Sequence, residues 1–246
     1  FKNVSLTYSG SGAPSVEGIN FKAMKGQTIG VIGGTGSGKS SLVNLIPRLY
    51  DATQGEVLVD GVNVKDYDIE TLRNKVGIVM QKAVLFKGTI RENMWMGKKG
   101  ATDEQIDEAL EISQSKEFVD SKQGRLDYVI EQGGKNLSGG QRQRLTIARA
   151  LVRKPDVLIL DDSASALDFA TDAALRKAIR GMNNSPTVFI VSQRAASLMY
   201  ADLIIVLDDG KVAGMGTHDE LLANCEVYKE IYESQFKKAD SEGGVA

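Results

Sequence analysis

One run of eight residues has the types and spacing of a loop that binds phosphate groups. It reads Gly33-Gly34-Thr35-Gly36-Ser37-Gly38-Lys39-Ser40 and matches the pattern Gly-x-x-x-x-Gly-Lys-Ser/Thr. Its glycines let the backbone bend so that successive N–H groups point at an anion, and the helix N-terminus that follows adds positive partial charge. Lys39 supplies an ammonium group for the β- and γ-phosphates, and the Ser40 hydroxyl supplies a ligand for Mg²⁺.

Two acidic residues follow an apolar run much later in the chain. Residues 157–160 read Val-Leu-Ile-Leu, and Asp161 and Asp162 come directly after them. Open α/β sheets bind ligands at the carboxyl ends of their strands, which makes Asp161 the candidate partner of Mg²⁺. Taken alone, two adjacent acids could merely cap a turn before Ser163. A phosphate loop in the same chain favours the metal-binding interpretation.

A second glycine-containing segment, here named the signature segment, reads Leu137-Ser138-Gly139-Gly140-Gln141. It stands just before a predicted helix whose apolar residues Leu145, Ala148 and Val152 fall at i, i+3 and i+7. Its serine is the expected N-cap of that helix. Two glycines in a first helical turn cost stability relative to alanine, so they indicate close approach of the backbone to another group, such as a second phosphate.

The elements that must position these segments predict an α/β fold. Residues 28–32 form a β-rich run that ends in the glycines of the loop, and from residue 40 to residue 46 the apolar spacing turns helical. Residues 157–160, 188–191 and 203–207 are short apolar runs, which is the pattern of buried parallel strands covered by helices.

The remaining segments predict smaller elements. The alternation of apolar and polar residues within residues 1–32 is typical of short antiparallel strands. Further strands are expected at residues 55–60 and 76–80, with a short helix at residues 69–74 between them. The character changes from residue 82 to residue 134, where Thr102 and Gln105 form a capping box and a mostly helical insertion is expected.

Composition limits the classes of partner. The 246 residues are 42% apolar and 25% charged, which is enough for one well-packed globular unit. A net charge of -2 argues against broad electrostatic attraction to nucleic acid or anionic lipid.

The cysteine content and the apolar runs indicate the environment of the chain. The only cysteine, Cys225, cannot form an internal disulfide, so the chain fits a reducing compartment and Cys225 fits the role of a small packing residue. The apolar runs are far shorter than the ~20 residues that cross a bilayer, and the start at Phe1 is expected for an excised domain.

These motifs together resemble the ABC transporter ATPase family, over about residues 1–236. The resemblance rests on the phosphate loop, the signature segment, the aspartate-ended strand, Gln81 and the run Ser165-Ala166-Leu167-Asp168. It implies a P-loop NTPase (RecA-like) core with a mostly parallel sheet, an N-terminal antiparallel β subdomain and a helical subdomain carrying the signature segment. The implied division is core and β subdomain at residues 1–81 and 151–236, helical subdomain at residues 82–150, and a flexible tail at residues 237–246.

The resemblance also implies how the domain works. Two such domains pair head to tail, so that ATP with Mg²⁺ lies between the phosphate loop of one and the signature segment of the other. Tyr8 would then stack on adenine, Gln81 would reach Mg²⁺ and the attacking water, and Asp168 would cross the dimer interface. The remaining residues implied for the nucleotide site are Val16, Gly34, Thr35, Gly36, Ser37, Gly38, Lys39, Ser40 and Ser41. Those implied for Mg²⁺ are Ser40, Gln81 and Asp161.

Residues 85–93 resemble the version of this segment found in exporters. The implied partners are a second ATP-binding domain and the transmembrane domains of an exporter, without nucleic acid. The implied location is the cytoplasmic face of the cell membrane, with the domain itself soluble.

Two residues depart from the family pattern, which generally has Glu at position 162 and His at position 193. Asp162 retracts the carboxylate by one methylene, and misplacement of a general base by about 1 Å can cost on the order of 10²-fold in rate. Gln193 can donate and accept hydrogen bonds but cannot become charged as imidazole can. Both lie in this chain's own half-site while the signature segment is intact. The sequence therefore favours a heterodimer in which this chain hydrolyses ATP slowly and lends its signature segment to an active partner.

Other interpretations stay open at this point. The only histidine, His218, stands within a capping box formed by Thr217 and Glu220, and is expected to be structural. A soluble ABC ATPase of DNA repair is one alternative, although residues 82–150 hold no sustained heptads. A soluble ABC protein of translation and a nucleotide-binding regulator without turnover are the others.

Overall fold

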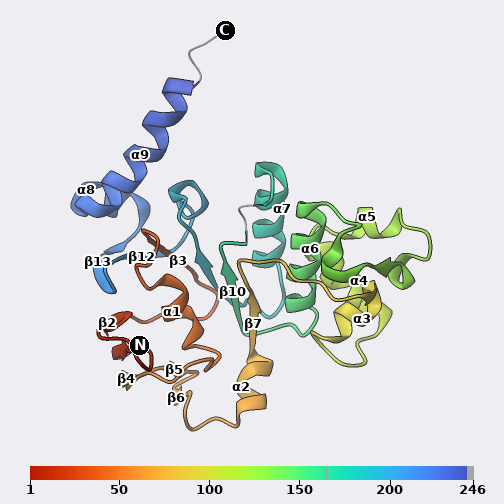
Figure 1. The fold of residues 1–246 in the computed structure, drawn as a ribbon, viewed down its shortest axis with the longest axis horizontal. Helices are drawn as coiled ribbons and strands as arrows, with labels where there is room; N and C mark the ends of the chain where they lie inside the picture. Colours follow the sequence, from red (N-terminus) through yellow and green to blue (C-terminus); the bar gives the residue numbers. More distant parts are fainter. Residues whose placement is uncertain (164–165, 243–246) are drawn as a thin grey trace. The chain divides into compact units, whose positions relative to one another are not determined.

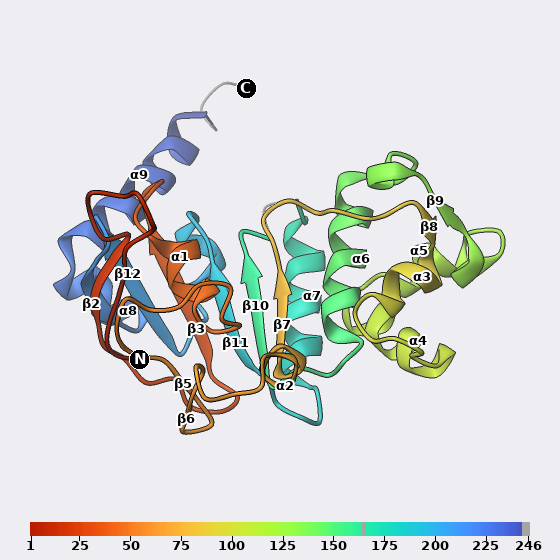
Figure 2. The same cartoon turned by 60° about the horizontal axis from the view of Figure 1, so that its bottom comes forward.

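The computed structural model describes residues 1–163 and 166–242, with side chains as far as residue 235. The chain divides into two compact units (Figures 1 and 2). We name residues 1–73 with residues 187–246 the phosphate-loop unit, because it contains that loop, and residues 74–186 the signature unit.

The N-terminal part of the phosphate-loop unit is an antiparallel sheet, as predicted. Strand β1 (Lys2–Leu6) pairs with β2 (Val16–Ile19) on one side and β4 (Gln54–Glu56) on the other. The strand expected at residues 55–60 is instead divided, because β5 (Leu58–Val59) forms a separate hairpin with β6 (Val62–Asn63). Asp60 and Gly61 both have positive φ, 52° and 80°, which is the backbone of a tight type I′ turn.

The main sheet of the phosphate-loop unit has the strand order β13-β12-β3-β11. Strands β11 (Thr187–Val191) and β12 (Leu203–Asp208) run parallel to β3 (Thr28–Gly33), which confirms the predicted parallel arrangement. Strand β13 (Lys211–Gly216), which the sequence did not predict, pairs antiparallel with β12. All residues of β3 and β11 are buried, so this sheet is the core of the unit.

Four helical segments accompany this sheet. Helix α1 (Lys39–Asn44) contacts β3 and β11, and the one-turn helix η3 (Ala195–Ser197) follows β11. Helix α8 (His218–Asn224) contacts β13, and α9 (Glu226–Glu242) lies against β12, β13 and η3. The predicted flexible tail begins within α9, whose backbone continues to residue 242, and residues 243–246 lie outside the described part.

The signature unit combines a strand pair with a group of helices. Strand β7 (Val76–Val79) is parallel to β10 (Val157–Asp161), and helix α2 (Ile69–Lys75) leads into it. Helix α6 (Gly139–Leu151) packs against β7 and against two other helices, α3 (Ile90–Trp95) and α4 (Asp103–Ile112). The unit also contains α5 (Lys116–Asp120), α7 (Phe169–Arg180), η1 (Arg125–Asp127), η2 (Gln132–Gly134), and the paired strands β8 (Gly88–Thr89) and β9 (Val129–Ile130). Within residues 82–134, where the sequence predicted a mostly helical insertion, helices α3, α4 and α5 are the main regular elements, and loops and turns connect them.

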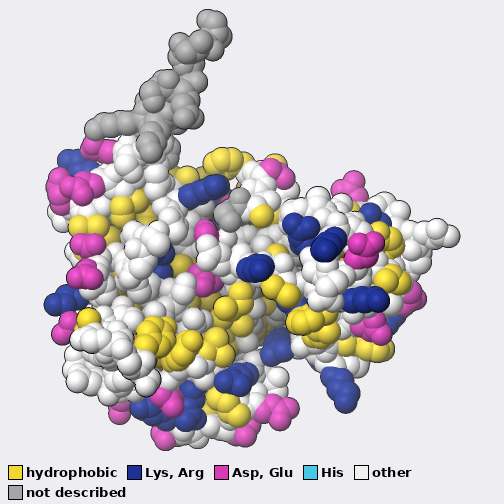
Figure 3. Space-filling view, viewed as in Figure 1, with side chains coloured by type: hydrophobic (Ala, Val, Ile, Leu, Met, Phe, Trp, Pro, Cys, Tyr) yellow, Lys and Arg dark blue, Asp and Glu magenta, His cyan; other side chains and the backbone are white. Residues whose placement is uncertain are grey.

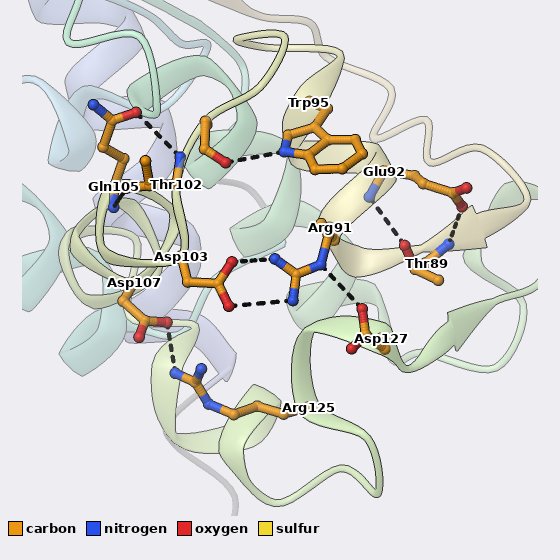
Figure 4. A network of polar contacts seen from close by, with 11 residues as sticks. Thr89, Arg91, Glu92, Trp95, Thr102, Asp103, Gln105, Asp107, Arg125 and Asp127 are labelled. Carbon is orange, nitrogen blue, oxygen red and sulfur yellow. Dashed lines mark hydrogen bonds and ion pairs between the residues drawn. The ribbon is translucent and has the colours of Figure 1, made fainter.

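Capping and ion pairs fix the helical part of this unit (Figure 4). The predicted capping box of Thr102 and Gln105 is present at the start of α4, and a second one is present at the start of α3. Arg91 of α3 binds two carboxylates, those of Asp103 and Asp127, which join α3 to α4 and η1. These contacts bring together three elements that are separate in the sequence.

The surface carries charged side chains of both signs together with exposed apolar ones (Figure 3). On the face drawn in Figure 3, Lys and Arg side chains are interspersed with Asp and Glu. Within the described residues, every helix is too short or too polar to cross a bilayer.

Candidate nucleotide-binding site

The phosphate loop connects β3 to α1, as the sequence predicted. Two of its glycines are required by their surroundings. A Cβ atom on Gly38 would lie 2.3 Å from the Ser15 carbonyl oxygen, and one on Gly33 would lie 2.1 Å from the Leu207 carbonyl oxygen. Gly38 also has φ 93°, which residues with a Cβ rarely adopt. Steric contact with the backbone of β12 and of the segment before β2 therefore fixes the course of the loop.

Lys39 lies within the loop that it is expected to serve. Its Nζ atom is 2.9 Å from the Gly33 carbonyl oxygen, 2.6 Å from that of Gly34, and 3.5 Å from the Ser37 hydroxyl oxygen. Its side chain is buried, whereas Gly34, Thr35, Gly36 and Ser40 are exposed. The ammonium group is therefore held at the base of a loop whose upper residues are accessible to a phosphate chain.

Tyr8 lies close to the start of α1. Its hydroxyl group donates a hydrogen bond to the Ser41 hydroxyl at 3.0 Å, and its ring meets the exposed Tyr50 ring edge-on at 4.8 Å between centroids. The two contacts fix the plane of the Tyr8 ring beside the loop. Val16 is fully buried, with Cγ1 2.7 Å from where a Cβ on Gly38 would lie, so it supports the loop from below.

Gln193 belongs to the same unit as the phosphate loop. It follows β11, which pairs with β3 as far as Val31, and the Ser192 N–H donates to the Val31 carbonyl at 3.1 Å. The backbone that carries Gln193 therefore begins beside the last residues of the strand that leads into the loop. Its side chain is exposed.

The signature unit brings together the acidic residues and Gln81. Asp161 is buried at the end of β10, with 5% of its surface exposed, and Asp162 follows it with φ 46°. The Gln81 side-chain N–H donates to the Asp162 carboxylate at 3.2 Å. Aspartate is one of the few residue types that tolerate this left-handed backbone conformation. The conformation of Asp162 is therefore only mildly strained.

The predicted Mg²⁺ ligands suit that ion in their chemistry. They are a hydroxyl (Ser40), a carboxylate (Asp161) and an amide oxygen (Gln81), and hard oxygen donors are what Mg²⁺ prefers. Gln81 uses its amide nitrogen in the bond to Asp162, which leaves its oxygen as the donor for a metal. Among the described side chains, those of residues 1–163 and 166–235, no cluster of three His, Cys, Asp or Glu residues could hold a metal by itself.

The signature segment begins α6 with the predicted cap. The Ser138 hydroxyl accepts from the Gln141 N–H at 3.2 Å, and the Gln141 side chain accepts from the Ser138 N–H at 3.1 Å. Ser138 and Gly139 are exposed, and Leu137 is buried. Asp168 caps α7 by accepting from the Thr171 N–H, and this hydrogen bond lowers the pKa of its carboxyl below the ordinary value. In the run that ends in Asp168, Ser165 lies outside the described residues.

His218 and Cys225, which the sequence analysis did not assign to the nucleotide site, have structural contacts, as predicted. His218 Nδ1 lies 2.8 Å from the Tyr228 hydroxyl, and its helix has the predicted capping box of Thr217 and Glu220. Cys225 is buried with its sulfur 3.8 Å from the Ala213 carbonyl oxygen. Tyr50 and Gln235, whose contacts lie beside the predicted site residues, escaped the sequence analysis. No local pattern marks either of them, because each acts on residues about 40 positions away.

Comparison with known proteins gives consistent results. Residues 16–165 match a family model described as ABC transporter. An uncharacterized ABC transporter ATP-binding protein of Mycobacterium tuberculosis (strain ATCC 25618 / H37Rv) is 44% identical over 98% of this chain and 41% of its own length. One of Bacillus subtilis (strain 168) is 44% identical over 98% of this chain and 42% of its own length. A Staphylococcus aureus (strain NCTC 8325 / PS 47) protein with the provisional name multidrug export ATP-binding/permease protein is 39% identical over 95% of this chain and 40% of its own length.

A solved structure agrees with these matches. It is described as a bacterial Atm1-family ABC exporter with ATP bound, is 32% identical and has a TM-score of 0.89 over 96% of this chain and 41% of that chain. The chain thus spans about two fifths of the length of the curated relatives that it matches. With the family model matching residues 16–165 and a phosphate loop of the required geometry, this chain belongs to the ABC transporter family as an ATP-binding domain of the exporter type.

Proposed function

We propose that this chain is the ATP-binding motor domain of an exporter, and that its own site hydrolyses ATP slowly. In this proposal Mg·ATP binds between this domain and a second, non-identical ATP-binding domain, and closure of the pair drives transport. The observation that carries the proposal is the phosphate loop, with its sterically required glycines and with Lys39 held at its base.

Binding of the triphosphate follows from this loop. The exposed backbone of Gly34, Thr35 and Gly36 can present N–H groups to the phosphate oxygens. Lys39 would exchange its loop carbonyl partners for phosphate oxygens, which are stronger acceptors for an ammonium group. Tyr8 would stack on adenine, with its ring held in plane by Ser41 and Tyr50. Bound Mg²⁺ would supply charge neutralisation at the β- and γ-phosphates.

Slow hydrolysis follows from Asp162 and Gln193. Asp162 must orient water with a side chain one methylene shorter than glutamate, and Gln81 draws the same carboxylate into a hydrogen bond at 3.2 Å. Gln193 can donate a hydrogen bond to the γ-phosphate but cannot gain the charge of a histidine. We expect this site to retain ATP for long periods.

The signature segment supports the idea of a partner. A Cβ on Gly140 would find its nearest neighbour, the Ala166 carbonyl oxygen, at 3.5 Å, and one on Gly139 would find the Arg142 side chain at 4.0 Å. Those distances are ordinary van der Waals contact or more, so packing within the described chain does not demand glycine. ATP bound to the partner domain would explain both glycines, because its phosphate would approach the first turn of α6 closely and leave no room for a side chain.

The same proposal places the domain at the cytoplasmic face of the cell membrane. The relatives are more than twice as long as this chain, and the S. aureus relative is named as a combined ATP-binding and permease protein. We infer that transmembrane domains are further partners, and that this domain transmits closure to them.

Titration with Mg·ATP tests nucleotide binding directly. We expect the full-length protein to bind Mg·ATP, and Lys39→Ala to weaken binding by at least about 10-fold, because one charge-assisted contact contributes roughly 1.5–3 kcal/mol. Steady-state turnover measured in parallel should be slow for this chain alone and faster with the partner. Absence of Mg·ATP binding would refute the proposal, and binding with fast turnover by this chain alone would refute the slow site. Turnover that stays absent with the partner would instead favour a nucleotide-binding regulator.

A further inference from the structure

The loop that carries Gln193 is bridged by one side chain from the C-terminal helix. Gln235 of α9 donates its side-chain N–H to the Gln193 carbonyl at 2.7 Å and accepts from the Ala195 N–H at 2.9 Å. The two backbone groups flank Arg194, so a single carboxamide satisfies the loop on both sides of that residue. A carboxamide carries an N–H donor and a carbonyl acceptor side by side, so this one side chain can make both hydrogen bonds.

The bridge replaces a cap that the local sequence does not provide. Arg194 is the N-cap residue of η3, and its side chain makes no capping hydrogen bond. Within the loop itself, the Arg194 N–H donates to the Ser192 hydroxyl at 2.9 Å, which leaves the Ala195 N–H to be satisfied from elsewhere. The Ala195 N–H would otherwise be an unpartnered donor at a helix start, and Gln235 supplies its acceptor from 40 residues away.

Both ends of the loop are anchored to β3, the strand that leads into the phosphate loop. At the first end the Ser192 N–H binds the Val31 carbonyl. At the second end the fully buried Leu198 packs under Gly30, where an added Cβ would lie 3.3 Å from the Leu198 side chain. Gln193 lies between these two anchors. The hydrogen bond from Gln235 fixes the backbone carbonyl group of Gln193.

Helix α9 is itself held firmly enough to serve as a support. Tyr228 is fully buried and its hydroxyl lies 2.8 Å from His218 Nδ1. Gln235 is seven residues further along, which places it on the same face of the helix as Tyr228. That face lies against β12, β13 and η3.

We propose that Gln235 is a positioning residue for the γ-phosphate contact of Gln193, and that it links α9 to the state of the nucleotide site. This inference rests on the proposed function, because it assigns a role within that site. In this role Gln235 contacts the backbone on both sides of Arg194 and not the nucleotide itself. It acts by restricting the backbone from which the Gln193 side chain extends, so that a hydrogen bond to the γ-phosphate costs little additional ordering.

Binding measurements in the full-length transporter test this role, with the partner's phosphate-loop lysine replaced so that only this chain's loop binds nucleotide. We expect Gln235→Leu to reduce the ratio of Mg·ATP to Mg·ADP affinity by about 3- to 10-fold while leaving the Mg·ADP affinity unchanged, since only ATP has a γ-phosphate. Gln193→Ala should cause the same loss, and the double variant should lose no more than either single variant. Gln235→Glu keeps the acceptor but not the donor and should fall between wild type and Gln235→Leu.

Hydrogen exchange provides a readout that does not depend on nucleotide. The amide of Ala195 should exchange about 10-fold faster in Gln235→Leu, while the amides of β12 stay unchanged. Gln123→Leu, the same substitution at an exposed residue of the signature unit, is the control and should alter neither readout.

The possible outcomes separate the two proposals. If the wild type binds neither nucleotide, the proposed function fails and this inference falls with it. If the wild type binds both and Gln235→Leu leaves the affinity ratio unchanged, only the positioning role is overturned. Additive losses in the double variant, or unchanged exchange at Ala195, would overturn it as well.

Discussion

The phosphate loop and the signature segment are both rich in glycine, but the space around their glycines differs. At Gly38 an added Cβ would lie 2.3 Å from backbone of the same chain, whereas at Gly140 the nearest atom would be 3.5 Å away. The fold itself requires the first glycine. Within the described chain, packing does not require glycine at position 140. We therefore infer that a group bound at this position requires it. The glycine of the phosphate loop is needed for packing within the chain, whereas the glycine of the signature segment leaves room for a bound group.

Replacing Gly38 with alanine should have the largest effect on stability. The new methyl group would overlap the Ser15 carbonyl oxygen and would force an alanine into φ 93°. We expect a loss of roughly 2–4 kcal/mol in the free energy of unfolding, measured by denaturant titration. Gly36→Ala is the matched control, since φ is 83° but nothing lies within 4 Å of the added Cβ. It should cost only about 1–2 kcal/mol, and equal losses would mean that sterics do not distinguish the two positions.

Replacing Ser138 with alanine tests how the signature segment is held. The capping box supplies an acceptor for the Gln141 N–H, and its loss should cost about 1 kcal/mol in the free energy of unfolding. Ser138→Thr, which keeps the hydroxyl group, should restore most of it. A thermal melt of each variant decides, and an unchanged melting temperature for Ser138→Ala would show that the box does not stabilise α6.

Replacing Gly140 with alanine should separate stability from function. The site has room for a methyl group, and alanine favours a helical first turn, so the free energy of unfolding should rise by up to about 1 kcal/mol or stay the same. ATP turnover of the assembled transporter should nevertheless fall, because the methyl group would obstruct the partner's nucleotide. If Gly140→Ala lowered stability but left turnover normal, Gly140 would be needed for packing within the chain and not for approach of the partner's nucleotide.

Acid titration should reveal the smallest effect, in the signature unit. Hydrogen bonding to Arg91 lowers the pKa of Asp103 below its ordinary value of 3.8, so this pair stabilises the folded state above that pH and loses its contribution as pH falls through the lower, folded-state pKa. Arg91→Leu should therefore reduce stability slightly at pH 7 and leave it nearly unchanged below the folded-state pKa. Parallel unfolding curves at the two pH values check this, and a penalty that persists in acid would point to packing.

Local patterns predicted most of the fold because their physical causes are local. The strand, loop and helix at residues 28–46, the caps at Thr102, Ser138 and Thr217, and the parallel apolar strands all follow from spacing and residue type. The division of residues 55–60 into two strands was missed because it depends on which strands pair with each half.

The candidate site was less predictable than the fold. The hydrogen bond between Gln81 and Asp162 joins residues 81 positions apart, and the bridge from Gln235 joins residues about 40 positions apart. No spacing rule covers such distances. The division of labour between this domain and a partner rests on the identities of Asp162 and Gln193, and it stays a prediction.

Restoring the two family residues is the most direct test of a slow site. Asp162→Glu with Gln193→His, assayed for single-turnover hydrolysis in the full transporter, should raise the rate at this site on the order of 10²-fold. Unfolding of the variant should be checked in parallel, since φ 46° tolerates glutamate less well than aspartate. A wild-type rate that already equals that of the restored variant would contradict the account.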